Sequence, residues 1–385
     1  MTTPSKSLLR HKAYQFRIYP NPEQEILITK TIGCCRFIYN HFLNLWNKAY
    51  LKTGKGLSYT TCSAMLPDMK KDEATHWLKE VDSIAIQSAL KNLADSFARF
   101  FKKQNNKPQF KSKKNPVQSY TTQFTNHNIA VLKRHVKLPK LGLVKFANSK
   151  EVKGRIINAT LRKNASGKFF VSILCEEEIV ELPKTEAAIG IDLGITHFAT
   201  LSDGRKIDNL RFTTSKEQKL QREQRKLSKR ATGAKARGVR LFEAKNYQKQ
   251  KRKVARYHEK VANQRNDFLN KLSTDLIKNH DVICIEHLNT KGMLRNRKLA
   301  KSISDVSWSR FVIKLQYKAD WYGRKIIPVD PWFPSSQLCS ACGHNDGKKL
   351  LHIRDWTCPV CHTHHDRDHN ASKNTLVEGL RLDTL

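Results

Sequence analysis

The sequence predicts a multidomain protein of mixed α/β and α+β class, and three observations lead to this prediction. The chain has 385 residues, enough for two or three domains with cores of their own. A helical block at residues 21–104 lies between strand-like segments, and from residue 186 onward short apolar strands alternate with long helices. Near the C-terminus, two Cys-x2-Cys pairs indicate a small metal-bound unit.

The chain opens with one strand and a helical block. Residues 11–19 alternate in polarity as a strand does, and Asn21-Pro22-Glu23-Gln24 has the form of a helix cap. Within the block, apolar residues recur at three- and four-residue steps, which indicates helices with a buried stripe. The stripe residues are Ile28, Ile32, Cys35, Tyr39, Phe42, Trp46 and Ala49, then Ile86, Leu90, Leu93, Phe97 and Phe101.

A loop and a sheet follow the helical block. Residues 102–116 are basic and rich in Asn and Pro, so we expect a domain boundary or a loop that contacts nucleic acid. The strand-like segments beyond it are residues 131–138, 141–147, 155–162 and 168–175. The last two are joined by a hairpin at residues 164–167. We expect a small β-barrel or sheet into which the strand at residues 11–19 pairs, so that the helical block is an insertion.

The second half of the chain begins with three strands. Residues 187–194 form an apolar strand that carries Asp192, and residues 197–202 and 206–209 follow. Three consecutive strands, the first with an acid, are typical of a ribonuclease H-like fold. Residues 281–287 form a further apolar strand, which suits a position buried on both faces of a sheet and closes on a carboxylate.

Helices are expected around these strands. Two long basic helices should cover residues 215–230 and 239–279, with interruptions at Gly233 and Gly238. The second of these should bury Val254, Tyr257, Val261, Phe268, Leu272 and Leu276. The remaining expected elements are a helix at residues 306–322, a strand at 325–329 and a last helix at 366–380. The order is therefore β-β-β-α-β-α-β, then the cysteine segment, then α.

Charge points to the class of partner. The net charge is +37, from 71 Lys and Arg against 34 Asp and Glu, and a polyanion is needed to offset such self-repulsion. On the two long helices we expect phosphate contact rather than a merely solvated face. The basic residues concerned are Lys219, Arg222, Arg225, Lys226, Lys229, Arg230, Lys249, Lys251, Arg252, Lys253 and Arg256. Anionic lipid is the alternative, but no amphipathic or lipidation signal accompanies the charge.

No stretch of the sequence approaches the roughly 18 apolar residues of a spanning helix, and residues 1–12 lack the apolar core of a secretion signal. We therefore expect a cytoplasmic protein with no membrane partner. Cysteine usage agrees with a reducing compartment, because five of the nine cysteines lie mostly among apolar neighbours and are expected to be small buried residues. These are Cys34, Cys35, Cys62, Cys175 and Cys284.

The cysteine pairs predict a structural zinc ion. Cys339 and Cys342 form the first pair, Cys358 and Cys361 the second, and fifteen residues separate them. Each short pair can bend round a metal, and the gap allows a hairpin to return the second pair, so one Zn²⁺ with four thiolate ligands is expected. Free or disulfide-bonded cysteines are the alternative.

Three carboxylates predict a catalytic metal site. Asp192 and Glu286 lie at strand ends, and an Asp-Arg-Asp segment opens the last helix. Acidic ligands of this kind can hold two divalent ions, which activate water and neutralise a leaving oxygen in phosphodiester cleavage. Mg²⁺ is expected because the ligands are hard oxygens. From the residues alone, Asp368 and Asp366 are nearly equivalent candidates for the third ligand.

These segments together resemble the TnpB family, the transposon-encoded RNA-guided nucleases of small bacterial insertion sequences, which are related to the type V CRISPR effectors. The motifs that carry the resemblance are residues 14–20, 33–40, 190–194, 285–288, 331–339 and 366–371, and they run nearly end to end. The resemblance implies that Asp192, Glu286 and Asp368 are a RuvC-type triad, which selects Asp368 by analogy. It also assigns the four cysteines to zinc.

The resemblance implies a domain plan and partners as well. The nuclease (RuvC-like) domain would carry an inserted zinc ribbon, and a wedge-like β-barrel would carry an inserted helical recognition lobe. The boundaries are 186–336 with 365–385, 337–364, 1–20 with 105–185, and 21–104, in that order. The expected partners are a structured guide RNA from the transposon end and double- and single-stranded DNA, bound by a monomeric protein in a nucleoid-associated ribonucleoprotein.

Single-stranded DNA at the acids could stack on Trp332, Phe333 or Trp356, although a core role fits each of them equally well. Two rival functions share most of these features. A DDE-type DNA transposase would use the same acids and fold but would also join strands. A non-catalytic RNA-guided DNA-binding repressor would not need the acids at all.

Overall fold

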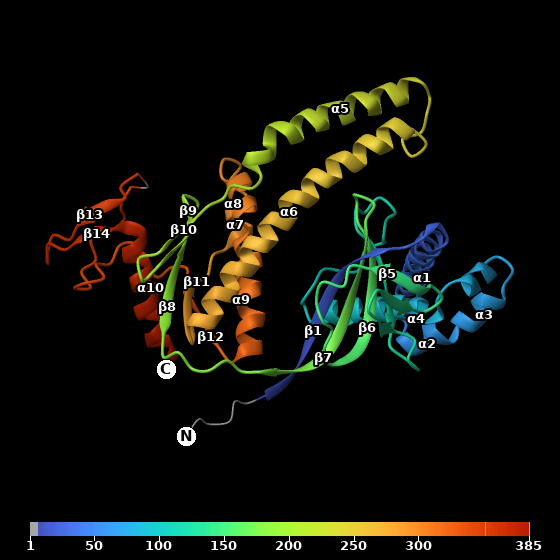
Figure 1. Ribbon diagram of the computed structural model, residues 1–385, viewed down its shortest axis with the longest axis horizontal. Coiled ribbons are helices and arrows are strands. Elements are labelled where there is room, and N and C mark those ends of the chain that lie inside the picture. Colours follow the sequence, from blue (N-terminus) through green and yellow to red (C-terminus); the bar gives the residue numbers. More distant parts are fainter. Residues whose placement is uncertain (1–6, 351, 385) are drawn as a thin grey trace. The chain divides into compact units, whose positions relative to one another are not determined.

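The computed structural model describes residues 7–350 and 352–384. The chain divides into two compact units, of which one is Leu9–Glu178 and the other consists mainly of Ile179–Leu385. In Figure 1 the first unit is coloured from blue to green and the second from green to red. Each unit is built round a β-sheet with helices packed against it.

Two long helices dominate the helical part of the first unit. Helix α1 (Pro22–Thr53) begins at the expected cap, where Asn21 and Gln24 bond to each other's backbone, and ends at Gly54, whose φ is 69°. Helix α4 (Ser83–Phe101) begins at Asp82. Between them lie α2 (Tyr59–Ala64), α3 (Leu66–Lys71) and the 3-10 helix η1 (His76–Glu80). Most residues of the predicted apolar stripes are buried and form core. Ala49 is only partly buried, and Phe101 is 69% exposed because it is the last residue of α4, so the prediction was wrong for Phe101.

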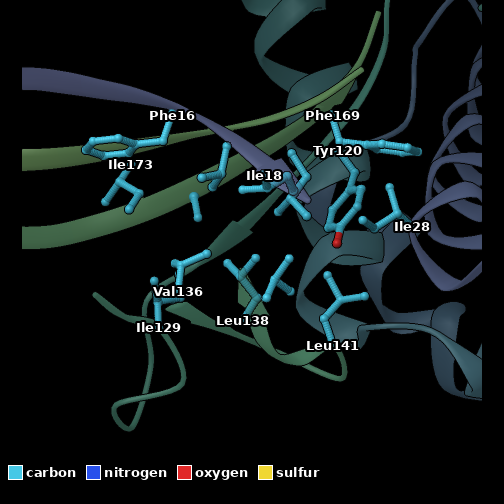
Figure 2. Packing of buried hydrophobic residues seen from close by; sticks show 14 of the residues in the cluster. Phe16, Ile18, Ile28, Tyr120, Ile129, Val136, Leu138, Leu141, Phe169 and Ile173 are labelled. Atoms are coloured by element: carbon cyan, nitrogen blue, oxygen red, sulfur yellow. The ribbon is translucent and has the colours of Figure 1, made fainter. Parts of the chain in front are cut away.

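A seven-stranded sheet completes this unit, in the order β2-β6-β7-β1-β5-β4-β3. The strands are β1 (Ser7–Tyr19), β2 (Gln118–Gln123), β3 (Ala130–Val131), β4 (His135–Leu138), β5 (Gly142–Phe146), β6 (Arg155–Lys163) and β7 (Phe169–Val180). Strand β1 pairs with β5 by placing Ile18 opposite Phe146, which confirms that the first strand joins the sheet. Figure 2 shows the core that Phe16, Ile18 and Ile28 form between the sheet and α1.

Two details of this sheet differ from the prediction. Residues 131–138 are two short strands, β3 and β4, because the chain turns back between them and pairs Val131 with Val136. Strand β2 was not predicted, since its sequence Gln-Ser-Tyr-Thr-Thr-Gln is polar. It buries Tyr120 and Thr122 on one side, and it is held along its length by β6.

The second unit has a five-stranded sheet in the order β10-β9-β8-β11-β12. The strands are β8 (Ala188–Leu193), β9 (His197–Leu201), β10 (Lys206–Asp208), β11 (Val282–Glu286) and β12 (Lys325–Val329), all close to their predicted positions. The first three form an antiparallel meander, whereas β8, β11 and β12 are parallel neighbours. This order places β8 and β11 at the centre, as their apolar sequences require.

Helices cover both faces of this sheet (Figure 1). On one face, the C-terminal half of α6 (Lys245–Asn279) and α9 (Trp308–Tyr322) bury Leu276, Phe311 and Leu315 against the strands. On the other face lies α10 (Arg367–Asp383), close to the predicted last helix. Shorter helices are η2 (Thr214–Lys216), α7 (Thr290–Met293) and α8 (Ala300–Val306).

Three helix boundaries correct the prediction. Helix α5 (Glu217–Ala236) runs through Gly233 without a break, since one glycine costs a helix only about 1 kcal/mol relative to alanine. Helix α6 begins at Lys245 and not at residue 239, because residues 237–244 form the turn between the two helices. The helix expected at 306–322 is α9 alone, and Ser307, at a φ of 58°, separates it from α8.

The cysteine segment forms a small unit of its own before α10. Strands β13 (Asp355–Thr357) and β14 (His364–Asp366) pair antiparallel and return the second cysteine pair toward the first. Over residues 7–350 and 352–384, none of the helices has the length and apolar character needed to cross a membrane.

Candidate active site and metal centre

Asp192 and Glu286 lie side by side at the C-terminal ends of the two central strands, β8 and β11. Strands β8 and β11 are parallel, and Ile191 is the register partner of Ile285, so the next residue of each strand is one of the acids. Both side chains are partly buried. The apolar runs that precede them place two carboxylates at the centre of the sheet, where little water can screen their charges.

Helix α10 separates the roles of the two candidate aspartates. Asp366 is the N-cap: its side chain accepts a hydrogen bond from the His369 backbone at 2.9 Å, and Lys206 donates to its other oxygen at 2.6 Å. These bonds outweigh the effect of burial and hold the pKa of Asp366 below its usual range. Asp368 lies within the first turn and is bonded by Arg354, whose Nη1 is 3.1 Å from its Oδ1.

The charges of two acids act on a third at this site. The pKa of Asp192 is raised well above its usual value, first by burial and then by the negative charges of Glu286 and Asp368. Burial also raises the pKa of Glu286, against the hydrogen bond that Ser335 donates to it at 2.8 Å. Glu286 and Asp368 thus both lie close enough to Asp192 for their charges to disfavour its ionised form.

Two glycines allow α10 to lie this close to the sheet. A Cβ at Gly190 would be 2.1 Å from the Ser372 carbonyl oxygen, and a Cβ at Gly379 would be 2.3 Å from the Cys284 sulfur. Any larger side chain at either position would push the helix away from β8 and β11. The helix carries Asp368 in its first turn, so these contacts set its approach to Asp192.

Buried amides connect α10 to the loop that enters the cysteine segment. Asn370 accepts from the Ser340 backbone at 2.8 Å and donates to the Leu338 carbonyl at 2.7 Å. Asn374 donates to the carbonyls of Ser335 and Leu338, and the hydroxyl of Ser335 in turn holds Glu286. One hydrogen-bond network therefore links the cysteine loop, the last helix and an acid of the central sheet.

Sequence reasoning gave no role to Asn370, Asn374, Ser335 or Arg354. The only signal available was that Asn370 and Ser335 fall within motifs at residues 366–371 and 331–339. Their partners lie 14 to 49 positions away along the chain, beyond the reach of helix or strand periodicity.

The four predicted cysteines form one cluster. Their sulfur atoms all lie within 4.8 Å of one another, and among the described residues this is the one group of His, Cys, Asp and Glu ligand atoms that is so compact. Cys339 and Cys361 sulfurs are 3.6 Å apart, and those of Cys342 and Cys358 are 3.7 Å apart. A tetrahedral zinc ion with Zn–S bonds of about 2.3 Å requires sulfur atoms about 3.8 Å apart, so the cluster fits a zinc site.

His365 is a further contact of this cluster that the sequence did not reveal. Its Nε2 is 3.0 Å from the Cys339 sulfur, and its ring packs 4.8 Å from the Trp356 ring, centre to centre. Trp356 is only 7% exposed and packs with the cysteines, so of the two roles left open for it by the sequence, the core role holds. Trp332 is 90% exposed, and Phe333 is partly buried.

The basic residues predicted on the two long helices all lie on exposed surface of α5 and α6. Three of them also face a buried acid: Arg222, Lys226 and Lys253 lie within 3.9, 3.6 and 3.2 Å of the Glu223 carboxylate. The rest leave the outer face of the hairpin strongly positive.

Comparison with known proteins identifies the family. Two relatives carry the name "Putative RNA-guided DNA endonuclease". One, from Streptomyces pristinaespiralis, is 38% identical over 96% of this chain and 89% of the relative. The other, InsQ of Escherichia coli (strain K12), is 31% identical over 96% of this chain and 92% of the relative. The chain belongs to the TnpB family.

Three family profiles match separate stretches of the TnpB chain. The profile OrfB_IS605, described as "Probable transposase", matches residues 172–297 and includes Asp192 and Glu286. A Cas12f1-like TNB domain matches residues 308–375, which contain the cysteine cluster and Asp368. A helix-turn-helix profile matches residues 10–55, where the structure has strand β1 and the single helix α1.

A solved structure supports the mixed α/β fold. The Cas12f1 chain of a Cas12f1–sgRNA–target DNA complex superposes with a TM-score of 0.55, covering 95% of this TnpB chain and 98% of that chain at 14% identity. The similarity at this identity concerns the fold alone.

Proposed function

We propose that this chain is an RNA-guided DNA endonuclease that hydrolyses DNA at Asp192, Glu286 and Asp368. The observation that carries the proposal is the convergence of these three carboxylates, two from adjacent parallel strands and one from the first turn of α10. The relatives named as RNA-guided DNA endonucleases are similar in sequence to this chain over nearly its whole length, which supports the same reaction class.

We propose a domain plan to go with this activity. A three-strand meander that continues into two parallel strands is typical of a ribonuclease H-like fold, which supports a RuvC-like nuclease domain at residues 186–336 and 365–385. The zinc ribbon would be residues 337–364. In the other unit, the sheet would be the wedge-like barrel, residues 1–20 and 105–185, and the helices at 21–104 the recognition lobe.

The acids fit a pair of Mg²⁺ ions. Their oxygens are hard donors, and burial together with the charges of Glu286 and Asp368 raises the pKa of Asp192, an effect that a divalent cation would offset. When bound, such ions activate the attacking water and neutralise the leaving oxygen. Among the chain's own groups, Ser335 holds the Glu286 carboxylate, and Arg354 holds that of Asp368. Arg354 would have to share or release Asp368 when the ions bind.

The cysteine cluster would hold one structural zinc ion. Its position, joined through Leu338 and Ser340 to the amides of α10, supports a mechanical role. The ribbon would fix where α10 begins, and hence where Asp368 stands. Loss of zinc would then reduce cleavage through local unfolding rather than through loss of a metal-bound nucleophile.

The expected partners are a structured guide RNA from the transposon end and double- and single-stranded DNA. The net charge of +37 and the exposed basic residues of α5 and α6 support polyanion binding. Base pairing with the guide would select the target, while the protein reads a short flanking motif. We propose a monomeric protein in a ribonucleoprotein that works in the cytoplasm, at the nucleoid.

A DDE-type transposase is the second candidate, because the profile over residues 172–297 carries a transposase description. The decisive experiment is to purify the ribonucleoprotein from its native locus, sequence the bound RNA, and offer plasmid libraries that carry the matching target. Guide-dependent cleavage beside a fixed flanking motif supports the endonuclease. Strand-transfer products with transposon ends would support the transposase, and binding without cleavage would support a repressor.

A further inference from the structure

The hairpin of α5 and α6 carries its tip far from the sheet of its own unit. Leu269 of α6 is fully buried against the sheet, and Lys245 begins the helix 24 residues earlier. At 1.5 Å per residue, the tip stands about 36 Å from that anchor. Figure 1 shows the two helices side by side as they project (yellow-green and yellow).

A buried glutamate holds the projecting helices together. Glu223 of α5 has a side chain only 2% exposed, and Gln250 of α6 donates to it at 2.8 Å and to its backbone carbonyl at 2.9 Å. The hydrogen bond from Gln250, and then contacts with Lys253 and Lys226, lower the pKa of Glu223 to about 2. Glu223 is therefore ionised and pairs with Lys226 and Lys253 inside the hairpin, and it does not line either hollow at the tip.

The tip has two hollows lined by basic side chains. One, of about 460 Å³, lies between the end of α5 and the start of α6 and is lined by Lys229, Arg230, Arg237 and Lys245. The other, of about 630 Å³, shares Lys245 and adds Lys249 and Arg252. The one acid that lines either hollow is Glu243, and Arg240 pairs with it. Concave, positively charged surfaces of this size fit phosphate groups.

An exposed aromatic ring stands beside these hollows. Phe242 is 66% exposed and lines the larger hollow, and the Arg240 guanidinium lies over its ring, 4.7 Å from the centroid. Because the Phe242 ring is mostly exposed, it is not part of the hydrophobic core, and its apolar surface has no packing role. A flat apolar ring flanked by cations is the arrangement on which unpaired bases stack.

We propose that this tip, residues 229–256, is a binding site for an unpaired nucleotide. The base stacks on Phe242, and the neighbouring phosphates enter the hollows beside Lys245 and Arg237. The strand belongs to the guide RNA or to the displaced DNA, a choice that rests on the proposed function. The recognised chemistry is the same for both, namely a base face next to two or three phosphates. No role for the tip follows from the acids or from the zinc cluster.

The test measures binding of the full-length protein to fluorescein-labelled 12-nucleotide single strands of RNA and of DNA, and to the blunt duplex of each. Phe242→Ala should weaken binding of a single strand about 5- to 150-fold, the range for one stacked base, and leave the duplexes unchanged. Phe242→Trp should restore the affinity. The strand type that loses more affinity, RNA or DNA, identifies the source.

Charge variants complete the test. Arg237→Ala with Lys245→Ala should weaken every probe and reduce the salt dependence of binding by about one unit per lost phosphate contact. Lys271→Ala is the control, because Lys271 lies on α6 in the half that packs on the sheet, away from the tip, and pairs with Asp267 at 2.8 Å. It should leave binding unchanged.

Two results with Phe242→Ala would overturn the proposal. One is that the variant binds both single strands as tightly as the wild type does, and the other is that it loses equal affinity for single strands and for duplexes. The nuclease proposal fails separately, if Asp192→Asn still cleaves target DNA. Oligonucleotide binding does not depend on that carboxylate, so either inference can fail while the other stands.

Discussion

The close approach of α10 to the sheet makes Gly190→Ala the most informative perturbation of the site. The new Cβ would lie 2.1 Å from the Ser372 carbonyl oxygen, whereas ordinary contact begins at 3.4 Å. The helix must therefore retreat by about 1.3 Å, the difference between these two distances. Asp368 lies one turn before Ser372 on the same helix, so its carboxylate should move by about 1 Å.

A displacement of this size should lower the rate of DNA cleavage about 100-fold, since a shift of about 1 Å in a catalytic group has that effect. Overpacking should also cost about 1–3 kcal/mol of stability. The assay is single-turnover cleavage of a guide-matched plasmid at saturating Mg²⁺, at a temperature where the variant remains folded by circular dichroism. Binding of guide and target should be retained.

Gly33→Ala is the matched control, because a Cβ at Gly33 of helix α1 meets nothing within 4 Å. It should leave cleavage unchanged and add up to about 1 kcal/mol of stability. If Gly190→Ala cleaves at the wild-type rate while folded, the approach of α10 does not position Asp368 and the reasoning is refuted.

Three further outcomes are expected. Asp192→Asn should raise the melting temperature of the metal-free protein at pH 7, because the folded protein loses stability as pH rises from about 4 when the pKa of a buried carboxyl is raised. The gain should vanish at lower pH. An unchanged melting temperature at pH 7 would contradict the raised pKa of Asp192. Cys358→Ser should lose the bound zinc, as elemental analysis would show, expose the first turn of α10 to hydrogen exchange and reduce cleavage at least tenfold. The control Cys284→Ser should retain zinc. If the first turn of α10 stayed fully protected from exchange without zinc, the mechanical role of the cluster would be contradicted. Lys318 of α9 donates hydrogen bonds to the Asn270 carbonyl, Ser273 and Thr274, and burial lowers its pKa to about 8. The folded protein therefore binds this proton less readily than the unfolded chain, and stability should rise between about pH 8 and 10.5. Lys318→Met should remove that rise, as denaturant titrations at a series of pH values would show.

Local patterns predicted most of the elements because they record burial directly. The cap at Asn21 and the apolar runs before Asp192 and Glu286 have the meaning that helix and strand physics gives them. Strand β2 escaped because it is polar and takes its place from pairing with β6. The glycine at 233 was overinterpreted, since tertiary packing readily offsets its low helix propensity.

The candidate site was partly visible in the sequence for the same reason. Acids at the ends of apolar strands could be found by pattern, but the choice between Asp366 and Asp368 could not. That choice depends on which one caps α10 and meets Lys206, a residue 160 positions away. The contact of Arg354 with Asp368 and the support of Glu286 by Ser335 are likewise tertiary facts that no local period encodes.

The central claim is that Asp192, Glu286 and Asp368 together cut DNA, and one comparison tests it most directly. Guide-dependent plasmid cleavage should be measured for Asp368→Asn and Asp366→Asn, with target binding measured in parallel. We expect Asp368→Asn to lose cleavage by at least 1,000-fold, the order of effect of removing a group essential to catalysis, with binding intact. Asp366→Asn, which retains a capping side chain, should keep most of its activity. Retained cleavage in Asp368→Asn, or an equal loss in both variants, would contradict the claim.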